Sequence, residues 1–404
     1  MYDTIIIGAR CAGAATALLL SQQGHKVLLV DRAAVGSDIP HGHFVHRGGT
    51  AKLQAWGVLD KLDCPLVTTV VMGMGEGEPL TGTDLYFGDV PFGVGPRRRV
   101  LDKLLVETAV AAGVELRDQV VVEDFRCDGD QIRGIQARDL RSGQRFREQA
   151  PMTIGVDGRH SRLARTVDAP MFETVPPLLC YYFSYWSGID YGALEVHSKN
   201  QRVIFAFPTN DNLFAIFVAW PVAMFQQVRS DIESHYMAVL DRAPALAERA
   251  RAGKREEPFY GTADLPNYFR KPYGPGWALV GDAGHHKDPY MALGVADAFR
   301  DAELVAEAVH EGLTGCQPFD AALANYETQR NELAMPLYRE NIARASFAPP
   351  PPEVAQIRNA LLANQDQADT NAFLSAALGL TPPESFFNPA NVGRIMQKAA
   401  VVTA

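Results

Sequence analysis

Three short segments share one pattern, although they lie far apart in the chain. Residues 5–13, 154–158 and 277–282 each form an apolar run that ends in glycine with an acidic residue nearby. This pattern predicts a buried strand that opens onto a tight turn. Glycine turns of this kind bind phosphate, and carboxylates at strand ends bind sugar hydroxyls. The residue types therefore favour nucleotide chemistry.

The first segment has the spacing of a dinucleotide-binding turn. Gly8 lets the backbone reverse, and Gly13 lets the next helix pack closely, with its N-terminal amides aimed at a pyrophosphate. Asp31 ends the next predicted strand, where its carboxylate can accept hydrogen bonds from ribose hydroxyls. Arg10 stands where the usual pattern has its middle glycine. The alternative is a glycine-punctuated strand and helix in another α/β fold.

The second and third segments extend this prediction. Asp157 and Gly158 alone are also typical of a simple Asp-Gly turn. Asp282 follows Gly281 at a strand end, where a carboxylate can hold the sugar-alcohol chain of a flavin. The helix that begins near Gly294 can stabilise negative charge on a reduced ring. The alternative is a surface loop with a capping aspartate. Together, the three segments predict FAD, bound along its whole length.

On these motifs the chain resembles the class A flavoprotein monooxygenases of the p-hydroxybenzoate hydroxylase type, in the FAD/NAD(P)-binding superfamily. The resemblance implies a glutathione-reductase-like FAD domain with an inserted substrate sheet. It places Arg98, or its neighbour Arg97 or Arg99, against FAD, and Arg47 near the flavin or the reductant. The cofactor-binding residues that it implies are Gly8, Ala9, Cys11, Ala12, Gly13, Asp31, Arg32, Arg47, Arg98, Val122, Asp157, Gly281, Asp282, Pro289, Gly294 and Val295.

The resemblance also implies a reaction. Non-covalently bound FAD, reduced by NADPH or NADH, forms a C4a-hydroperoxide with O2 and inserts one oxygen atom into an aromatic or polyketide-like substrate. Two residues depart from the family pattern: Arg10, and Met291, which stands where many members have a glycine beside the flavin ring. His285 and His286 are candidate general bases because imidazole titrates near neutral pH, although His285 also matches a structural histidine.

Aromatic side chains in the middle of the chain predict a substrate pocket. On a strand through residues 179–186, Tyr181, Phe183 and Tyr185 would share one face. The predicted pocket is lined by Tyr181, Phe183, Tyr185, Phe205, Phe207, Phe217 and Met291. The alternative for each ring is ordinary packing in the core.

The order of predicted elements indicates an α/β protein with three parts. A βαβ unit opens the chain, and an antiparallel meander follows between residues 120 and 148. We expect a discontinuous FAD-binding Rossmann domain of residues 1–170 and 271–345. A mostly antiparallel substrate-binding sheet is expected over residues 171–270, and a helical C-terminal extension over residues 346–404.

The composition argues against other classes of protein. A net charge of −9 disfavours nucleic acid binding. No apolar run approaches the roughly 20 residues of a membrane span, and no basic and apolar leader opens the chain. Five scattered cysteines fit a reduced compartment, and no Cys/His spacing indicates a metal site. We expect a cytoplasmic monomer or homodimer that takes a small aromatic or apolar substrate.

Three rival families share the FAD fold. Flavin halogenases usually carry a Trp-x-Trp-x-Ile-Pro signature, which this sequence lacks. Reductases of the geranylgeranyl type are the main alternative, because residues 205–208 are similar to their substrate-sheet motif. The dissociation inhibitors of small GTPases are non-catalytic and have a degenerate flavin site. Asp31, Asp157 and Asp282 are all present here, which disfavours this last class.

Overall fold

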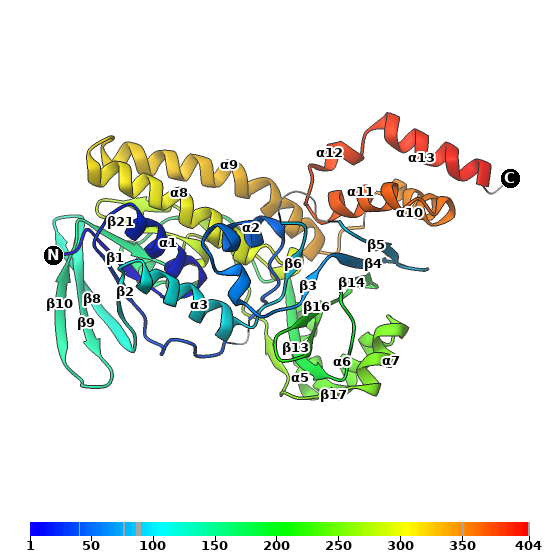
Figure 1. The fold of residues 1–404 in the computed structure, drawn as a ribbon, viewed down its shortest axis with the longest axis horizontal. Coiled ribbons are helices and arrows are strands. Elements are labelled where there is room, and N and C mark those ends of the chain that lie inside the picture. The colour runs from blue at the N-terminus through cyan, green and yellow to red at the C-terminus, as the bar shows by residue number, and fades with distance from the viewer. Residues whose placement is uncertain (40, 76, 86–89, 350, 403–404) are drawn as a thin grey trace.

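The computed structural model describes residues 1–39, 41–75, 77–85, 90–349 and 351–402. The chain forms two sheet-based parts, and its C-terminal helices lie beside the second part (Figure 1). The N-terminus lies at one end of the long axis and the C-terminus at the other.

Five parallel strands form the centre of the first part. In spatial order they are β21 (Trp277–Leu279), β11 (Met152–Gly155), β1 (Thr4–Ile7), β2 (Val27–Val30) and β7 (Glu115–Arg117), and β20 (Tyr273–Gly274) joins β21 antiparallel. The three glycine segments follow β1, β11 and β21, which are neighbours. Because parallel strands end at the same edge of a sheet, the three turns meet there.

Both faces of this sheet are covered. One face packs against α1 (Cys11–Gln22), α3 (Arg98–Ala111) and α8 (Gly294–Thr314), and the other against the meander of β8 (Val120–Asp128), β9 (Gln131–Asp139) and β10 (Arg145–Gln149). Ile6 of β1 packs with the helices, whereas Ile5 and Ile7 pack with the meander. A strand buried on both faces is continuously apolar. The predicted α/β fold is confirmed.

The second part is an eight-stranded sheet. In spatial order its strands are β17 (Lys254–Arg255), β13 (Leu179–Ser187), β16 (Leu213–Pro221), β15 (Arg202–Thr209), β14 (Ala193–Lys199), β4 (Thr69–Met74) and β5 (Leu80–Gly82), and β18 (Tyr260–Thr262) also pairs with β13. One face packs against α5 (Phe225–Ser230), α6 (Ile232–Leu240) and α7 (Pro244–Ala252). β4 and β5 lie within residues 1–170, the segment expected to bind FAD. They belong to the second sheet because β4 pairs in parallel with the distant β14.

A small sheet connects the two parts. β12 (Met171–Val175) leads into the second sheet, β19 (Asn267–Arg270) leads back, and β22 (His285–His286) pairs with β19. The long helix α9 (Phe319–Ala345) packs along α8 (Figure 1). The remaining short elements are α2 (Arg47–Ala55), α4 (Arg162–Thr166), β3 (Leu66–Val67), β6 (Gly93–Val94), and the 3-10 turns η1 (Leu59–Lys61), η2 (Val222–Met224), η3 (Gly281–Ala283) and η4 (Pro289–Met291).

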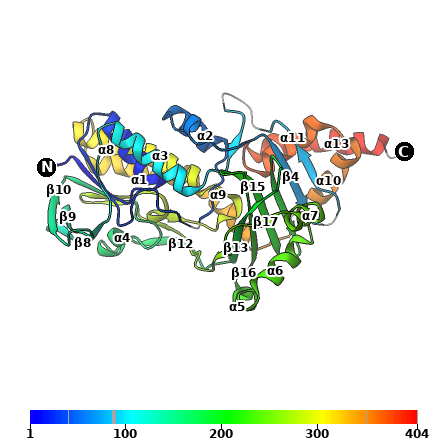
Figure 2. The ribbon, with the colours of Figure 1, turned by 60° about the horizontal axis from the view of Figure 1, so that its bottom comes forward.

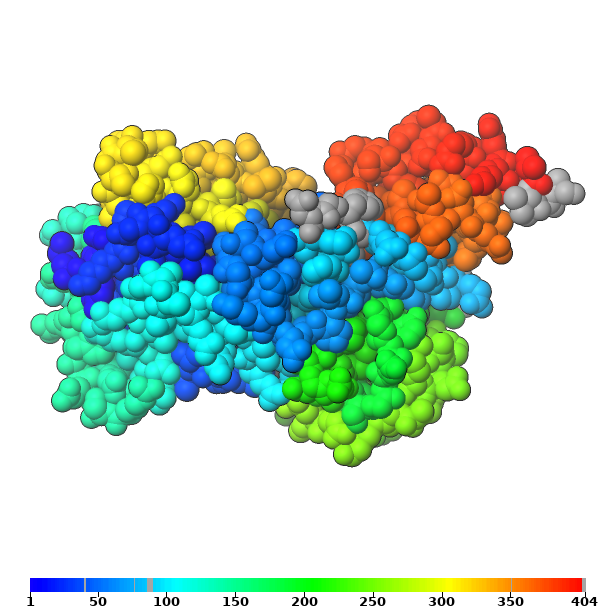
Figure 3. Space-filling view, in the orientation of Figure 1, coloured from blue at the N-terminus to red at the C-terminus, as the bar shows by residue number. Residues whose placement is uncertain are grey.

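The C-terminal residues form helices beside the edge of the second sheet (Figures 2 and 3). These are α10 (Pro352–Asn364), α11 (Gln367–Ala377), α12 (Pro383–Phe386) and α13 (Pro389–Val402). Phe373 and Leu374 of α11 share an apolar cluster with Leu80 of β5. The Asn371 side chain accepts from the Thr83 amide at 3.2 Å and donates to the Thr83 carbonyl at 2.7 Å. None of the described helices has the length and apolar character that a bilayer span requires.

We expect Phe373→Ala to lower the free energy of unfolding by about 3–5 kcal/mol, because removal of a buried ring leaves a cavity. Phe373 is 1% exposed and its ring contacts those of Phe386 and Phe387. Urea unfolding followed by circular dichroism measures the change. Leu333→Ala, at a position that is 52% exposed on α9, should cost less than about 0.5 kcal/mol. Equal losses in the two variants would contradict a packed C-terminal extension.

Candidate cofactor site

The first glycine turn depends on two residues that have no side chain. Gly8 has a φ of +112°, and a Cβ there would lie 2.4 Å from the Val156 carbonyl oxygen. A Cβ at Gly13 would lie 1.8 Å from the Gly8 carbonyl oxygen. β1 therefore passes into α1 in direct backbone contact with the end of β11. This contact leaves the first amides of α1, from Cys11 and Ala12 onward, at the edge of the sheet.

Asp31 lies at the end of β2 beside this turn. Its carboxylate accepts hydrogen bonds from the amides of Ala9 at 2.6 Å and Ala33 at 2.7 Å. A hollow opens here, lined by Ala9, Arg10, Asp31, Ala33, Ala34, Val35, Gly36, Ser37, Asp102 and Val106. Arg32 is exposed, and the Val122 side chain is buried between the sheet and the meander. Only the backbone of Val122 is therefore available to a ligand.

Arg98, the first residue of α3, is fixed by an ion pair. Its guanidinium donates to Asp102 Oδ1 at 3.0 Å, and the Cys11 thiol donates to the same oxygen at 3.0 Å. Burial alone lowers the pKa of Arg98, but the Asp102 carboxylate raises it overall. Burial raises the pKa of the Cys11 thiol, so this cysteine stays protonated. Arg98 is thus a fixed cation beside the first turn of α1.

Asp282 reaches the same region from the end of β21. Gly281 has a φ of +59°, and a Cβ there would lie 3.2 Å from the Ala12 Cβ, so η3 packs against α1. The Asp282 side chain is exposed, and its carboxylate accepts no hydrogen bond from the described residues. Its backbone carbonyl is held by the Tyr268 hydroxyl at 2.7 Å. An open carboxylate on a fixed backbone fits a cofactor rich in hydroxyl groups.

His41 is a residue of this region that the sequence analysis missed. Its side chain is reached by solvent although protein groups encircle it. Burial and the charge of Arg98 lower its pKa to about 4, and Asp282 acts in the opposite direction. The available signal was the run of three histidines over residues 41–46.

Asp157 has a different environment from the other two strand-end carboxylates. Its Oδ2 accepts from the Arg162 amide at 2.7 Å, at the start of α4, and its Oδ1 has no partner among the described residues. Burial raises its pKa, while hydrogen bonds from Ser161 and Arg162 act in the opposite direction. Gly158 follows with a φ of +78°. One oxygen of Asp157 therefore supports the local fold, and the other is buried without a partner among the described residues.

The two candidate general bases are occupied by protein partners. His285 is 4% exposed, stacks on Phe269 with ring centroids 4.9 Å apart, and lies 3.1 Å from Asp301 Oδ2. His286 contacts the Pro266 carbonyl through Nδ1 and stacks on Tyr268. Burial lowers the pKa of His286. Both imidazoles are therefore held by protein contacts, His285 against α8 and His286 against Pro266 and Tyr268.

The loop before α8 is braced on both sides. The Asn341 side chain accepts from the Met291 amide at 3.1 Å and donates to the Asp288 carbonyl at 2.9 Å. Pro289 is exposed, whereas Met291 is buried with its Cε beside Gly379, beyond α11. Ala292 has a φ of +52°, a left-handed conformation that is strained for a residue with a Cβ.

The amino end of α8 follows this loop. Gly294 is exposed there and Val295 is buried. Arg47 opens α2, and a Cβ at Gly49 on this helix would lie 3.6 Å from Ala296 of α8. The structure thus brings Arg47 close to the α8 N-terminus.

The predicted aromatic residues share one face of the second sheet. Phe183 stacks on Phe217 at 4.3 Å between ring centroids, Phe217 stacks on Phe207 at 5.7 Å, and Phe205 lies 5.6 Å from Phe207. Phe205 is half-buried and the others are buried, so the rings largely fill the space that they enclose. Tyr181 lies apart from this cluster.

A buried polar chain joins the aromatic face to the first part of the molecule. His43 Nδ1 lies 3.0 Å from the Gly95 carbonyl, and Nε2 lies 3.0 Å from the Tyr185 hydroxyl. Burial and the charge of Arg97 lower the pKa of His43 to about 3. The neutral ring therefore donates through Nδ1 and accepts through Nε2. Arg97 lies over the Tyr185 ring at 4.0 Å and pairs with Glu257 at 2.7 Å. No motif of the sequence marks His43.

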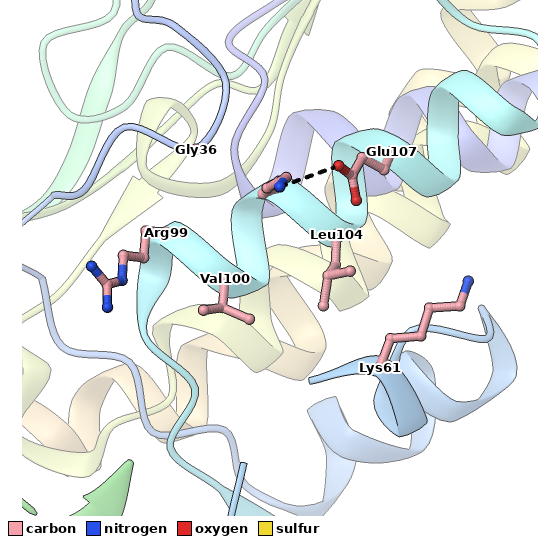
Figure 4. Close-up of a pocket in the computed structure, with 7 residues that line it drawn as sticks. Gly36, Lys61, Arg99, Val100, Leu104 and Glu107 are labelled. Carbon is pink, nitrogen blue, oxygen red and sulfur yellow. Dashed lines mark ion pairs between the residues drawn. The ribbon is translucent and has the colours of Figure 1, made fainter. Parts of the chain in front are cut away.

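A second hollow lies on the outer side of α3. It is lined by Gly36, Lys61, Arg99, Val100, Lys103, Leu104 and Glu107, and shares Gly36 with the first hollow. Val100 and Leu104 point toward the segment that carries Lys61 (Figure 4). Lys103 pairs loosely with Glu107 at 3.7 Å. The hollow therefore has an apolar floor and a mainly cationic rim.

The match to a known family agrees with this geometry. A family model described as "FAD binding domain" matches residues 1–341. The chain is 22% identical over 343 residues to a digeranylgeranylglycerophospholipid reductase from Methanocella arvoryzae, covering 82% of this chain and 83% of the relative. The flavin-dependent brominase Bmp2 superposes with a TM-score of 0.74 at 18% identity, covering 98% of this chain and 93% of that one. PqsL, "a probable FAD-dependent monooxygenase" from Pseudomonas aeruginosa, gives 0.73 at 19% identity, covering 85% and 96%.

The chain belongs to the FAD binding domain family, as the sequence motifs predicted. It is an FAD-dependent oxidoreductase. The residues at the edge of the first sheet fit the cofactor, because a helix N-terminus, the fixed Arg98 and the open carboxylate of Asp282 lie there.

We expect Asp282→Ala to weaken FAD retention by about 10-fold or more, because a charge-assisted hydrogen bond would be lost. Gel filtration followed by the flavin-to-protein absorbance ratio measures retention. The melting temperature of the flavin-free protein should not change, since the carboxylate has no partner among the described residues. Asp130→Ala, on the exposed turn after β8, is the matched control. Full retention by the Asp282 variant would contradict the assignment.

Asp288 should give the protein a pH-dependent stability. Burial raises its pKa to about 6, although a hydrogen bond from the Tyr181 hydroxyl at 2.6 Å acts in the opposite direction. Aspartate in an unfolded chain titrates near about 4. The folded state therefore binds the proton more tightly, and the unfolding free energy should fall as the pH rises from about 4 to about 6. Urea unfolding of the wild type and Asp288→Asn across this range tests it. A stability difference that is constant with pH contradicts the prediction.

Proposed function

We propose that this protein is an NAD(P)H-dependent monooxygenase that hydroxylates an aromatic or polyketide-like small molecule. One observation carries the proposal: an aromatic sheet face lies against residues that adjoin the cofactor site. Phe205 and Phe207 contact Phe44, which precedes α2, and Ala292 of the loop before α8 packs against the same cluster. An apolar, aromatic wall beside a redox cofactor suits a flat apolar substrate.

The residues at the sheet edge have distinct proposed roles in holding FAD. The α1 N-terminus and Arg98 bind the pyrophosphate, Asp31 binds the adenosine ribose and Asp282 binds the ribityl chain. The amides of Gly294 and Val295 stabilise negative charge near the ring, and Arg47 lies on the same side. FAD, when bound, supplies the electron transfer and the activation of oxygen.

The C-terminal extension is proposed to complete the substrate wall. Leu378 and Leu380, which follow α11, pack against the cluster that contains Phe207 and Phe217, and both are partly exposed. The half-buried Phe205 and Val196 pack against the same cluster and are register partners. Because the buried rings already fill their own space, these partly exposed residues are the best candidates for first contact with a substrate.

A double-bond reductase is the second candidate function. The reductase from Methanocella arvoryzae is similar over most of both chains, and its name gives a prenylated phospholipid as substrate. The apolar character of the proposed wall also suits an alkene chain. The two candidates differ in whether O2 is consumed.

We expect NADPH or NADH oxidation by the purified holoprotein to be stimulated by a member of a panel of phenols and polyketide-like aromatics, with matching O2 uptake measured at an oxygen electrode. The product should be heavier by one oxygen atom in mass spectrometry. Saturation of a prenyl alkene by dithionite-reduced protein without O2 would instead favour the reductase. Substrate-independent O2 uptake, with no product in either assay, would contradict both functions.

A further inference from the structure

Arg10 is the residue of the first turn that the dinucleotide pattern does not account for. It precedes α1 with φ −95° and ψ −166°, an extended conformation open to any residue. Gly8 and Gly13, by contrast, have backbone atoms where a Cβ would stand. The fold therefore needs glycine at positions 8 and 13 but not at position 10. The side chain at position 10 is therefore available to contact a ligand.

The Arg10 side chain is half-buried and lines the hollow that also contains Ala9, Asp31 and Asp102. Its guanidinium forms no hydrogen bond or ion pair with the residues that the structure describes. Neither neighbouring carboxylate forms an ion pair with Arg10 within the salt-bridge distance. Asp31 accepts from the amides of Ala9 and Ala33. Asp102 accepts from Arg98 and Cys11 through Oδ1, and its Oδ2 has no partner among the described residues. A half-buried cation without a counter-ion is costly unless an anion reaches it.

Burial lowers the pKa of Arg10, with further lowering from Arg98, while Asp102 and Asp31 act in the opposite direction. The guanidinium nevertheless remains charged at neutral pH, since arginine titrates far above it. The free amides of the α1 N-terminus add positive potential at the same place. The hollow thus combines a helix N-terminus, an unpaired guanidinium and a ribose-type carboxylate.

We infer that Arg10 is a phosphate ligand of FAD that contacts the ADP portion of the cofactor through its guanidinium. The usual middle glycine clears space so that the backbone alone meets the pyrophosphate. Here, an extended arginine adds a side-chain cation to that contact, and a guanidinium can form two parallel hydrogen bonds to a phosphate. The inference rests on the proposed position of FAD at this edge of the sheet.

Release of FAD from diluted holoprotein, followed by the rise in flavin fluorescence, tests the inference. We expect Arg10→Gly and Arg10→Met to weaken FAD binding by about 10- to 100-fold, and Arg10→Lys to weaken it less. The difference in FAD affinity between the wild type and the variants should become smaller as salt is added. Added ions screen the contact between Arg10 and the phosphate in the wild type, so its removal then costs less. Binding of riboflavin, which has no phosphate, to the flavin-free protein should not change.

Arg133→Met is the matched control. It removes the same charge from an exposed position on β9, in the meander. It should leave FAD binding unchanged. If Arg10→Gly binds FAD as the wild type does, the inference is overturned while the cofactor assignment stands. If wild-type protein binds no FAD, the proposed function itself fails.

A structural role for Arg10 has a different signature. If Arg10 were the internal counter-ion of Asp102, Arg10→Gly would lower the melting temperature of the flavin-free protein and weaken riboflavin and FAD binding equally. That result would also overturn the inference. An unchanged melting temperature with selective loss of FAD binding supports it.

Discussion

The close approach of the first turn of α1 to the end of β11 is the constraint on which the rest of this structure depends. The Val156 carbonyl occupies the place of a Gly8 side chain, and the Gly8 carbonyl occupies that of Gly13. Gly281 then lets η3 meet α1 at Ala12. These contacts bring the ends of β1, β11 and β21 together, and they fix the N-termini of α1 and α8 near one edge. Positive helix ends and strand-end carboxylates converge only because the backbones touch.

The charges of the molecule fall into two groups. Beneath α8, Lys287 and Arg300 pair with Asp297, Arg300 also pairs with Asp301, and His285 lies against Asp301. These buried groups compensate one another, as burial requires. At the sheet edge, the Asp282 carboxylate and the Arg10 guanidinium have no partner among the described residues. The first group holds the helix in place, and the second group has no protein partner that would compete with the proposed cofactor contacts.

The turns of the candidate cofactor site could be predicted from the sequence, because their signals are local. A few adjacent residues are enough to recognise a glycine whose missing side chain leaves room for a carbonyl oxygen. The same holds for an aspartate at the end of a strand. The placement of β4 and β5 could not be predicted, since it depends on pairing with β14 across more than a hundred residues. Strand alternation predicted that Phe183 and Tyr185 share a face, but not that Phe183 stacks on Phe217 and that buried rings fill the space on this face.

The segment before α2 shows why the substrate is harder to predict than the cofactor. His43 is held to the second sheet through Tyr185, and to the residue that follows β6 through Gly95. A few residues later, Arg47 opens a helix that packs on α8 at the cofactor site. Both ends of this short segment are fixed, so it links the position of the aromatic face to the position of α2 beside α8. In the proposed function, the substrate lies between two walls that come from different parts of the chain. The identity of the substrate therefore depends on the spacing between the two walls, which no single motif encodes. Each proposed cofactor contact, by contrast, depends on a single turn.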